Sequence, residues 1–244
     1  MFPDSSWAVL AAAGAIGLAG GLSRGISGFG ATLIMVPLLA HIVPTQQAVA
    51  TVAVTTLVTN IPMCIALRRE AHWRAIAVIC IGAFAGLPLG LWVLTHLSSD
   101  ALRRVAGAVV LVSALSLALA RRRKADLGLP YQLGAGFAGG VLNGAVGLGG
   151  PPVVLYFLWT AATAQMSRAS FIAYFTVLQL VQVSALIPLG LVTAAALGWT
   201  ALVAPAMLLG SYLGSLAFRA GGHRYFRAIA LALLGGTGLA ALLR

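Results

Sequence analysis

The chain has 244 residues, of which 61% are hydrophobic and only 8% are charged, a composition that excludes a soluble globular protein. Its net charge of +11 is spread over short basic clusters between apolar runs, which argues against a nucleic-acid-binding surface and is typical of a membrane protein. Apolar runs long enough to cross a hydrocarbon core of about 30 Å recur, and no alternating β-barrel segments are present. We therefore expect an all-α, polytopic transmembrane protein.

The predicted elements follow one plan twice along the chain. Each half begins with two short apolar segments separated by glycines and continues with three full-length helices. No basic segment precedes the first apolar stretch, so we expect that stretch to be retained as a membrane helix. The first repeat, residues 1–120, holds segments 7–22, 29–42, 46–67, 74–96 and 101–120. After a basic linker at 121–130, the second repeat, residues 131–244, holds segments 131–142, 151–162, 169–190, 196–218 and 226–243.

The two glycine-rich breaks match each other. Residues 20–30, GGLSRGISGFG, align with residues 139–149, GGVLNGAVGLG, at a constant offset of 119, and five glycines coincide. Further along, GLPLG (86–90) parallels GSYLG (210–214). A break that recurs at the same place belongs to a repeated unit, so we predict two homologous repeats.

The basic residues indicate how the two repeats are oriented. If each broken pair returns to the side on which it starts, the repeats are inverted, and eleven basic residues face the cytoplasm against three outside. If each pair counts as one crossing, the repeats are parallel and the split is eight to six. Cytoplasmic loops are enriched in Lys and Arg, so we predict inverted repeats with both termini outside. Whether the broken pairs are re-entrant or fully spanning stays open.

Inverted repeats with broken helices are a transporter plan in which half-helix N-termini face an anionic substrate near the bilayer midplane. First-turn N–H groups have no intrahelical partner, and glycine lets the backbone approach an oxyanion closely. The alternative is that glycines only permit close helix packing, which we expect for the pairs Gly17/Gly21 and Gly136/Gly140. The backbone candidates for the substrate site are Gly28, Gly30, Gly147, Gly149 and Gly150.

Arg24 lies inside a predicted membrane segment. A charge at that depth marks a functional site by default, and a guanidinium forks well onto an oxyanion. The alternative is that Arg24 extends its head group to the cytoplasmic surface. Asn143 is its counterpart in the second repeat, and Ser27 and Thr32 add hydroxyl donors. We expect these four side chains to bind the substrate.

Four further polar residues are secondary candidates. Asn60, Gln179 and Gln182 are polar on otherwise apolar helices, and Gln179 and Gln182 share one helix face. They serve either as ligands or as hydrogen-bonding contacts between helices. Arg168 begins a helix at the membrane surface, where it either lines the mouth of a route or anchors the helix.

No catalytic or metal-binding constellation stands out. All four carboxylates fall in predicted loops or termini, so no membrane carboxylate is available to bind a cation or relay protons. The stretch GISG (25–28) resembles the serine motif of rhomboid-type proteases, but the second break has Val146 in place of Ser27, and no histidine is predicted beside it. We expect no enzyme activity, no metal and no cofactor.

The two breaks also carry a family resemblance. GISGFGATLIMVPLL (25–39) and NGAVGLGGPPVVLYFL (143–158), in a duplicated layout that covers essentially the whole chain, resemble the TauE/SafE family of sulfite exporters. The resemblance implies a multi-pass protein of the bacterial inner membrane that moves small sulfur-containing anions such as sulfite or organosulfonates. The second break has GGPP (149–152) where the first has GATL (30–33), so the two sides of a site need not be chemically alike.

We therefore expect a permease that exports small oxyanions by alternating access, with the anion held at the two broken helix N-termini. Its expected partners are the small anion and the lipid bilayer, and no nucleic acid; a homo-oligomer is left open. The alternatives are an anion channel, an importer of another small anion, or a membrane scaffold or assembly protein that transports nothing. The sequence leaves the substrate, the direction of flux and any coupling ion undecided.

Overall fold

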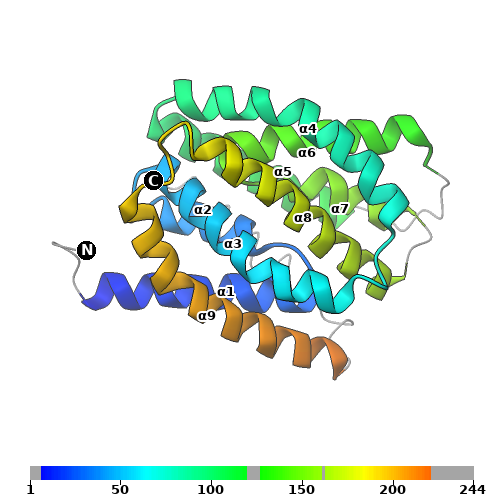
Figure 1. The fold of residues 1–244 in the computed structure, drawn as a ribbon, viewed down its shortest axis with the longest axis horizontal. Coiled ribbons are helices and arrows are strands. Elements are labelled where there is room, and N and C mark those ends of the chain that lie inside the picture. The colour runs from blue at the N-terminus through cyan, green and yellow to red at the C-terminus, as the bar shows by residue number, and fades with distance from the viewer. Residues whose placement is uncertain (1–6, 120–126, 161–162, 221–244) are drawn as a thin grey trace.

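The computed structural model describes residues 7–119, 127–160 and 163–220, which form α-helices and no strand (Figure 1). The described helices α1, α3, α4, α8 and α9 are long and apolar enough to cross a membrane. The expected all-α membrane class is therefore confirmed. In chain order the helices are α1 (Trp7–Ser27), α2 (Ala31–Leu39), α3 (Thr45–Leu67), α4 (Trp73–His96), α5 (Ser99–Leu119), α6 (Leu129–Val146), α7 (Gly150–Trp159), α8 (Ala164–Leu186) and α9 (Ala194–Arg219).

Predicted boundaries are wrong at α1, α6 and α8; α6, for example, ends at Val146 where the end was expected at residue 142. The first segment was expected to end at residue 22, but α1 continues through Arg24 to Ser27, and its 21 residues span about 32 Å. Glycine does not break a helix where no water competes for the backbone and a neighbouring helix packs on it. α8 begins at Ala164, five residues early, because the Thr163 side chain accepts the N–H of Met166, and it ends before Pro188. The predicted segment 226–243 lies outside the described residues.

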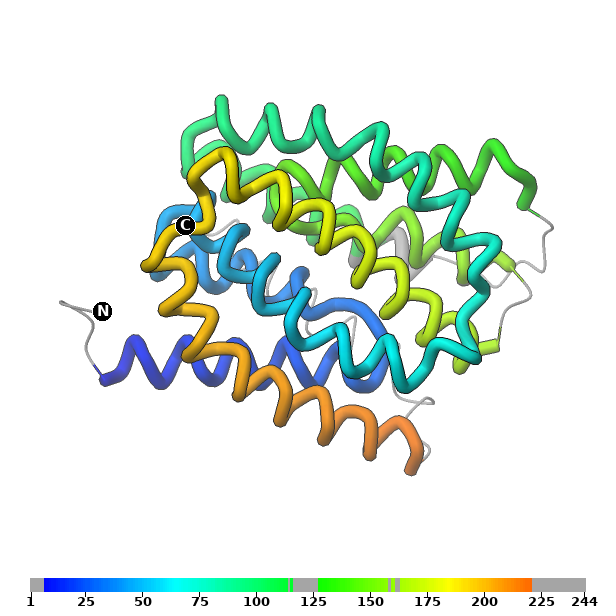
Figure 2. Tube along the Cα trace, viewed as in Figure 1, coloured from blue at the N-terminus to red at the C-terminus, as the bar shows by residue number. Residues whose placement is uncertain are grey.

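The helices pair across the two halves of the chain. α1 packs along α9, α4 packs along α6, and α3 and α8 lie between these pairs (Figures 1 and 2). α3 and α8 run antiparallel, since Gln179 bonds to Thr56 while Ser170 bonds to His72. α2 and α7, with 9 and 10 residues, reach only about 14 and 15 Å and are too short to cross a bilayer. Because α1 packs on α9 and α6 packs on α4, each half of the chain covers the first helix of the other half.

Glycines set the close approach within both helix pairs, and their contacts correspond. A Cβ on Gly86 of α4 would meet backbone atoms of Phe137 and Val141. A Cβ on Gly210 of α9 would meet those of Leu18 and Leu22. These sets match when α1 is shifted onto α6 by 119 residues and α4 onto α9 by 124, the offsets of the aligned sequence motifs.

The same contacts decide the role of the outer glycines. Cβ atoms on Gly17 and Gly21 would collide with α9, and Cβ atoms on Gly136 and Gly140 would collide with α4. The packing role that we expected for these four positions is therefore the one that the structure gives them.

Alanine at Gly140 is expected to lower the melting temperature of the purified protein. Its Cβ would overlap the Ala83 carbonyl, so α4 and α6 would have to separate, at a cost of about 1–3 kcal/mol. The control is Gly134→Ala on the same helix, because a Cβ there meets nothing within 4 Å and removes only unfolded-state freedom. Equal melting temperatures for the two variants in detergent would contradict the packing role.

Candidate anion-binding site

The first break is a turn built by two glycines and a serine. Gly28 has φ 81° and Gly30 has φ 90°, left-handed conformations that side-chain-bearing residues avoid. The Ser27 hydroxyl accepts the N–H of Phe29 at 3.1 Å and donates to the Ser23 or Phe29 carbonyl, each 2.6 Å away. Ser27, which we expected to bind substrate, is thus committed to the backbone and shapes the turn from which α2 starts.

A small cavity, lined by both polar and apolar side chains, lies beside this turn. Thr56 and Phe175, which line it, are the midpoints of α3 and α8, so the cavity lies at mid-depth of the helix bundle. Its volume of about 10 Å³ is close to the least that holds one water molecule. The lining residues are Arg24, Gly28, Phe29, Gly30, Ala31, Thr32, Thr56, Asn60, Phe175 and Gln179.

Arg24 supplies the charge at this cavity. Its side chain is only 3% exposed, so the head group lies inside the protein. The guanidinium donates to Thr59 Oγ1 at 2.8 Å, to Asn60 Oδ1, and to Ser211 Oγ at 2.9 Å. Its Nε is buried and has no hydrogen-bond partner. All of these acceptors are neutral, so within the described chain they do not balance the positive charge.

The second break forms an equivalent but uncharged contact. Asn143 Nδ2 donates to Gln182 Oε1 at 2.7 Å and to Gln179 Oε1 at 3.3 Å, while Gln182 Nε2 donates back to the Asn143 carbonyl at 2.8 Å. Asn143 and Gln179 correspond to Arg24 and Asn60 at the 119-residue offset. Asn143 is therefore buried at the position equivalent to Arg24, as the alignment predicts. Its side-chain amide, however, is hydrogen-bonded to Gln179 and Gln182.

The glycines of the second break do not line this cavity. The second break reaches the lining residues at two places: Asn143 Nδ2 donates to Gln179, and a Cβ on Gly150 would lie 3.2 Å from Phe175. Two physical differences separate the breaks. Pro151 and Pro152 remove two N–H donors from the start of α7, and Gly149 has φ −71° where Gly30 is left-handed.

Some of the secondary candidates line the cavity and others do not. Asn60 and Gln179 line the cavity, whereas Gln182 only bonds to Asn143. Arg168 packs against the outer side of Gly28 without lining the cavity. Five residues that line the cavity or hold Arg24 were not among the predicted site residues: Thr56, Thr59, Phe29, Phe175 and Ser211.

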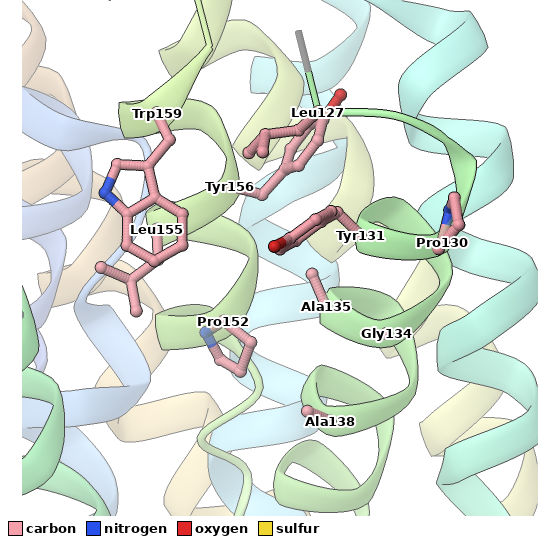
Figure 3. A pocket seen from close by; sticks show the side chains of 10 residues that line it. All are labelled: Leu127, Pro130, Tyr131, Gly134, Ala135, Ala138, Pro152, Leu155, Tyr156 and Trp159. Atoms are coloured by element: carbon pink, nitrogen blue, oxygen red, sulfur yellow. The ribbon is translucent and has the colours of Figure 1, made fainter. Parts of the chain in front are cut away.

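A larger cavity elsewhere lacks the chemistry for an anion. It measures about 400 Å³ and lies between α6 and α7, where the rings of Tyr131, Tyr156 and Trp159 surround it (Figure 3). Its other lining residues are apolar or glycine, and no charged side chain reaches it. The site of interest is therefore the small cavity at Arg24.

Membrane-spanning helices that enclose a small cavity with a buried arginine fit a membrane transporter for small anions. The chain belongs to the sulfite exporter TauE/SafE family, whose profile matches residues 13–241. It is 29% identical over 205 residues to the probable sulfite/organosulfonate exporter TauE of Cupriavidus necator, an alignment that covers 80% of this chain and 79% of that protein. No solved structure matches the chain. Membership confirms the resemblance, and because this is a transporter family, the chain is not an enzyme.

Proposed function

We propose that the chain carries small sulfur-containing oxyanions, such as sulfite or organosulfonates, out of the cell across a bacterial inner membrane. One observation carries the assignment: the buried Arg24 guanidinium has only neutral partners in the described chain. A buried charge without a counter-charge is costly, so proteins pair such charges. In the proposed function, the transported anion supplies the missing negative charge.

The cavity offers a coherent set of donors for an oxyanion. Arg24 contributes its free Nε, Thr32 lines the wall with a hydroxyl, and the first-turn N–H groups of α2 lack intrahelical partners. The helix dipole places positive potential at that end. These groups bind any small oxyanion, and the choice of sulfur anions follows from the name of the related C. necator protein.

The size of the cavity implies movement during transport. A sulfite ion has four heavy atoms and needs more room than the single water that about 10 Å³ admits. The antiparallel α3 and α8, and glycine contacts that correspond between the halves, support two inverted repeats that rock against each other. A negative cell interior drives an anion outward by about 2.3 kcal/mol per charge per 100 mV, so export needs no coupling ion.

Sulfite is expected to raise the melting temperature of the purified protein in detergent, because a ligand that binds only the native state stabilises it by mass action. At 100 times the dissociation constant the stabilisation is about 2.7 kcal/mol. Taurine, sulfate and acetate at matched ionic strength rank the anion classes, and Arg24→Gln is the matched variant. A shift of equal size in Arg24→Gln, or no shift with any sulfur anion, would contradict the proposal.

A further inference from the structure

Arg168 is a second buried arginine, and it lies just outside the cavity. It is 7% exposed, its Nη2 donates to Ser215 Oγ at 2.8 Å, and its Cζ lies 4.7 Å from the centre of the Phe218 ring. Like Arg24, it has a buried Nε without a hydrogen-bond partner. A Cβ on Gly28 would lie 2.7 Å from the Arg168 carbonyl oxygen and 3.0 Å from its Cγ. Gly28 therefore separates Arg168 from the cavity that it lines.

The two arginines are anchored on one face of α9. Arg24 bonds to Ser211, and Arg168 bonds to Ser215 one helical turn later, a rise of about 5.4–6 Å. The Ser215 hydroxyl in turn donates to the Ser211 carbonyl at 2.7 Å. The structure thus holds two guanidinium groups in succession along α9, each with an unused N–H.

The fold does not require this polar set, because the other half builds the same contacts from apolar residues. A Cβ on Gly28 would meet Arg168, whereas a Cβ on the equivalent Gly147 would meet the side chains of Val36, at 3.3 Å, and Val49, at 3.8 Å. In the same way, a Cβ on Gly25 would meet backbone atoms of Ser211 and Ser215. A Cβ on Gly144 would meet those of Leu87 and Leu91. Arg168, Ser211 and Ser215 therefore take the places that Val49, Leu87 and Leu91 have in the other half.

The polar set faces the end of the molecule where the basic loops lie. The loop after α3 is tied to α8 beside Arg168, since the His72 N–H donates to Ser170 Oγ at 2.9 Å. Arg219 and Glu70 act electrostatically on Arg168 with opposite signs. By the enrichment of Lys and Arg in cytoplasmic loops, this end faces the cytoplasm. For an exporter, it is the side from which the anion enters.

We propose that Arg168, anchored by Ser215, forms a second anion-binding station on the cytoplasmic side, one turn of α9 before the Arg24 site. The inference rests on the proposed transport of small oxyanions and adds an entry step to it. An arriving anion binds the free Nε–H of Arg168 and passes Gly28 to reach Arg24. Both steps are binding steps in which no covalent bond changes.

The test measures sulfite uptake into proteoliposomes and sulfite binding by thermal shift for wild type, Arg168→Gln, Arg168→Lys and Ser215→Ala. Arg168→Gln is expected to lower uptake at sulfite concentrations below KM at least tenfold, with the dissociation constant within threefold of wild type. Arg168→Lys keeps the charge and is expected to retain more than a third of the uptake. Arg74→Gln, an exposed cation at the same end, is the control and should behave as wild type.

The outcomes separate the two proposals. If wild type carries sulfite and Arg168→Gln carries it equally well, the second station is wrong while the proposed function stands. If Arg168→Gln abolishes equilibrium binding as Arg24→Gln does, there is one site and not two stations. If Arg168→Gln does not fold, Ser215→Ala decides: uptake lowered at least threefold below KM with unchanged binding supports the station, and unchanged uptake overturns it. If Arg24→Gln carries sulfite normally, the proposed function itself fails.

Discussion

Replacing Arg24 by glutamine or methionine is expected to abolish sulfite flux in proteoliposomes without lowering the melting temperature of the protein. Loss of one partner from a buried, hydrogen-bonded charge pair costs about 2–5 kcal/mol of binding, roughly 30- to 5000-fold in affinity. Without the anion, however, the guanidinium is a buried charge among neutral acceptors, and uncharged residues of similar volume remove a desolvation cost. Activity and stability are therefore expected to separate at this residue.

The conservative variant tests the geometry as well as the charge. Arg24→Lys keeps the cation but cannot reach Thr59, Asn60 and Ser211 together, so we expect partial flux at most. Arg104→Gln removes an exposed cation at the opposite end and is the matched control. Flux in Arg24→Gln within twofold of wild type would overturn the assignment of the site.

Alanine at Gly28 is expected to destabilise the protein by about 2–5 kcal/mol and to stop transport. Part of the cost, about 1–2 kcal/mol, is the left-handed backbone at φ 81°, which a Cβ disfavours. The remainder, about 1–3 kcal/mol, comes from overlap with the Arg168 backbone, whose carbonyl oxygen would lie 2.7 Å away. Thermal unfolding in detergent and sulfite flux measure the two effects.

Two other left-handed glycines separate strain from collision. Gly190 has φ 70° and open space around its Cβ position, so Gly190→Ala is expected to lose stability only through the left-handed backbone conformation. Gly147 has φ 72°, with Val36 Cγ2 at 3.3 Å, and its alanine variant is expected to fall between the other two. If Gly28→Ala and Gly190→Ala melt at the same temperature, the contact with Arg168 does not constrain the break.

The parts of the site that the sequence predicts are those that local patterns mark. Gly28 and Gly30 stand out because glycines recur at a break in an apolar run, and both are left-handed in the structure. Arg24 stands out because a charge is rare at that depth, and Asn60 and Gln179 because amides are rare on apolar helices. All of these residues line the cavity. The alignment at a 119-residue offset also pairs Arg24 with Asn143.

The remaining parts depend on packing between distant segments. Ser211, which holds Arg24, lies 187 residues away, and a serine on a membrane helix commonly bonds to its own backbone, as Ser211 also does. Local sequence gives no sign that α9 lies against α1. The sequence alignment carries the glycines of the second break, but it does not show that Pro151 and Pro152 remove two N–H donors from the start of α7.

The pairing of α1 with α9 has a consequence for biogenesis. Gly21 meets Met207, so α1 leaves the ribosome 186 residues before the helix that covers it, whereas Gly86 of α4 meets Phe137 only 51 residues later. At 5–20 residues per second, α1 waits roughly 10 to 40 s for α9, while α4 waits roughly 3 to 10 s for α6. Throughout that interval Arg24 is already in the membrane without Ser211. The bond between Arg24 and Ser211 therefore forms long after the partners of Arg24 on α3 are in place.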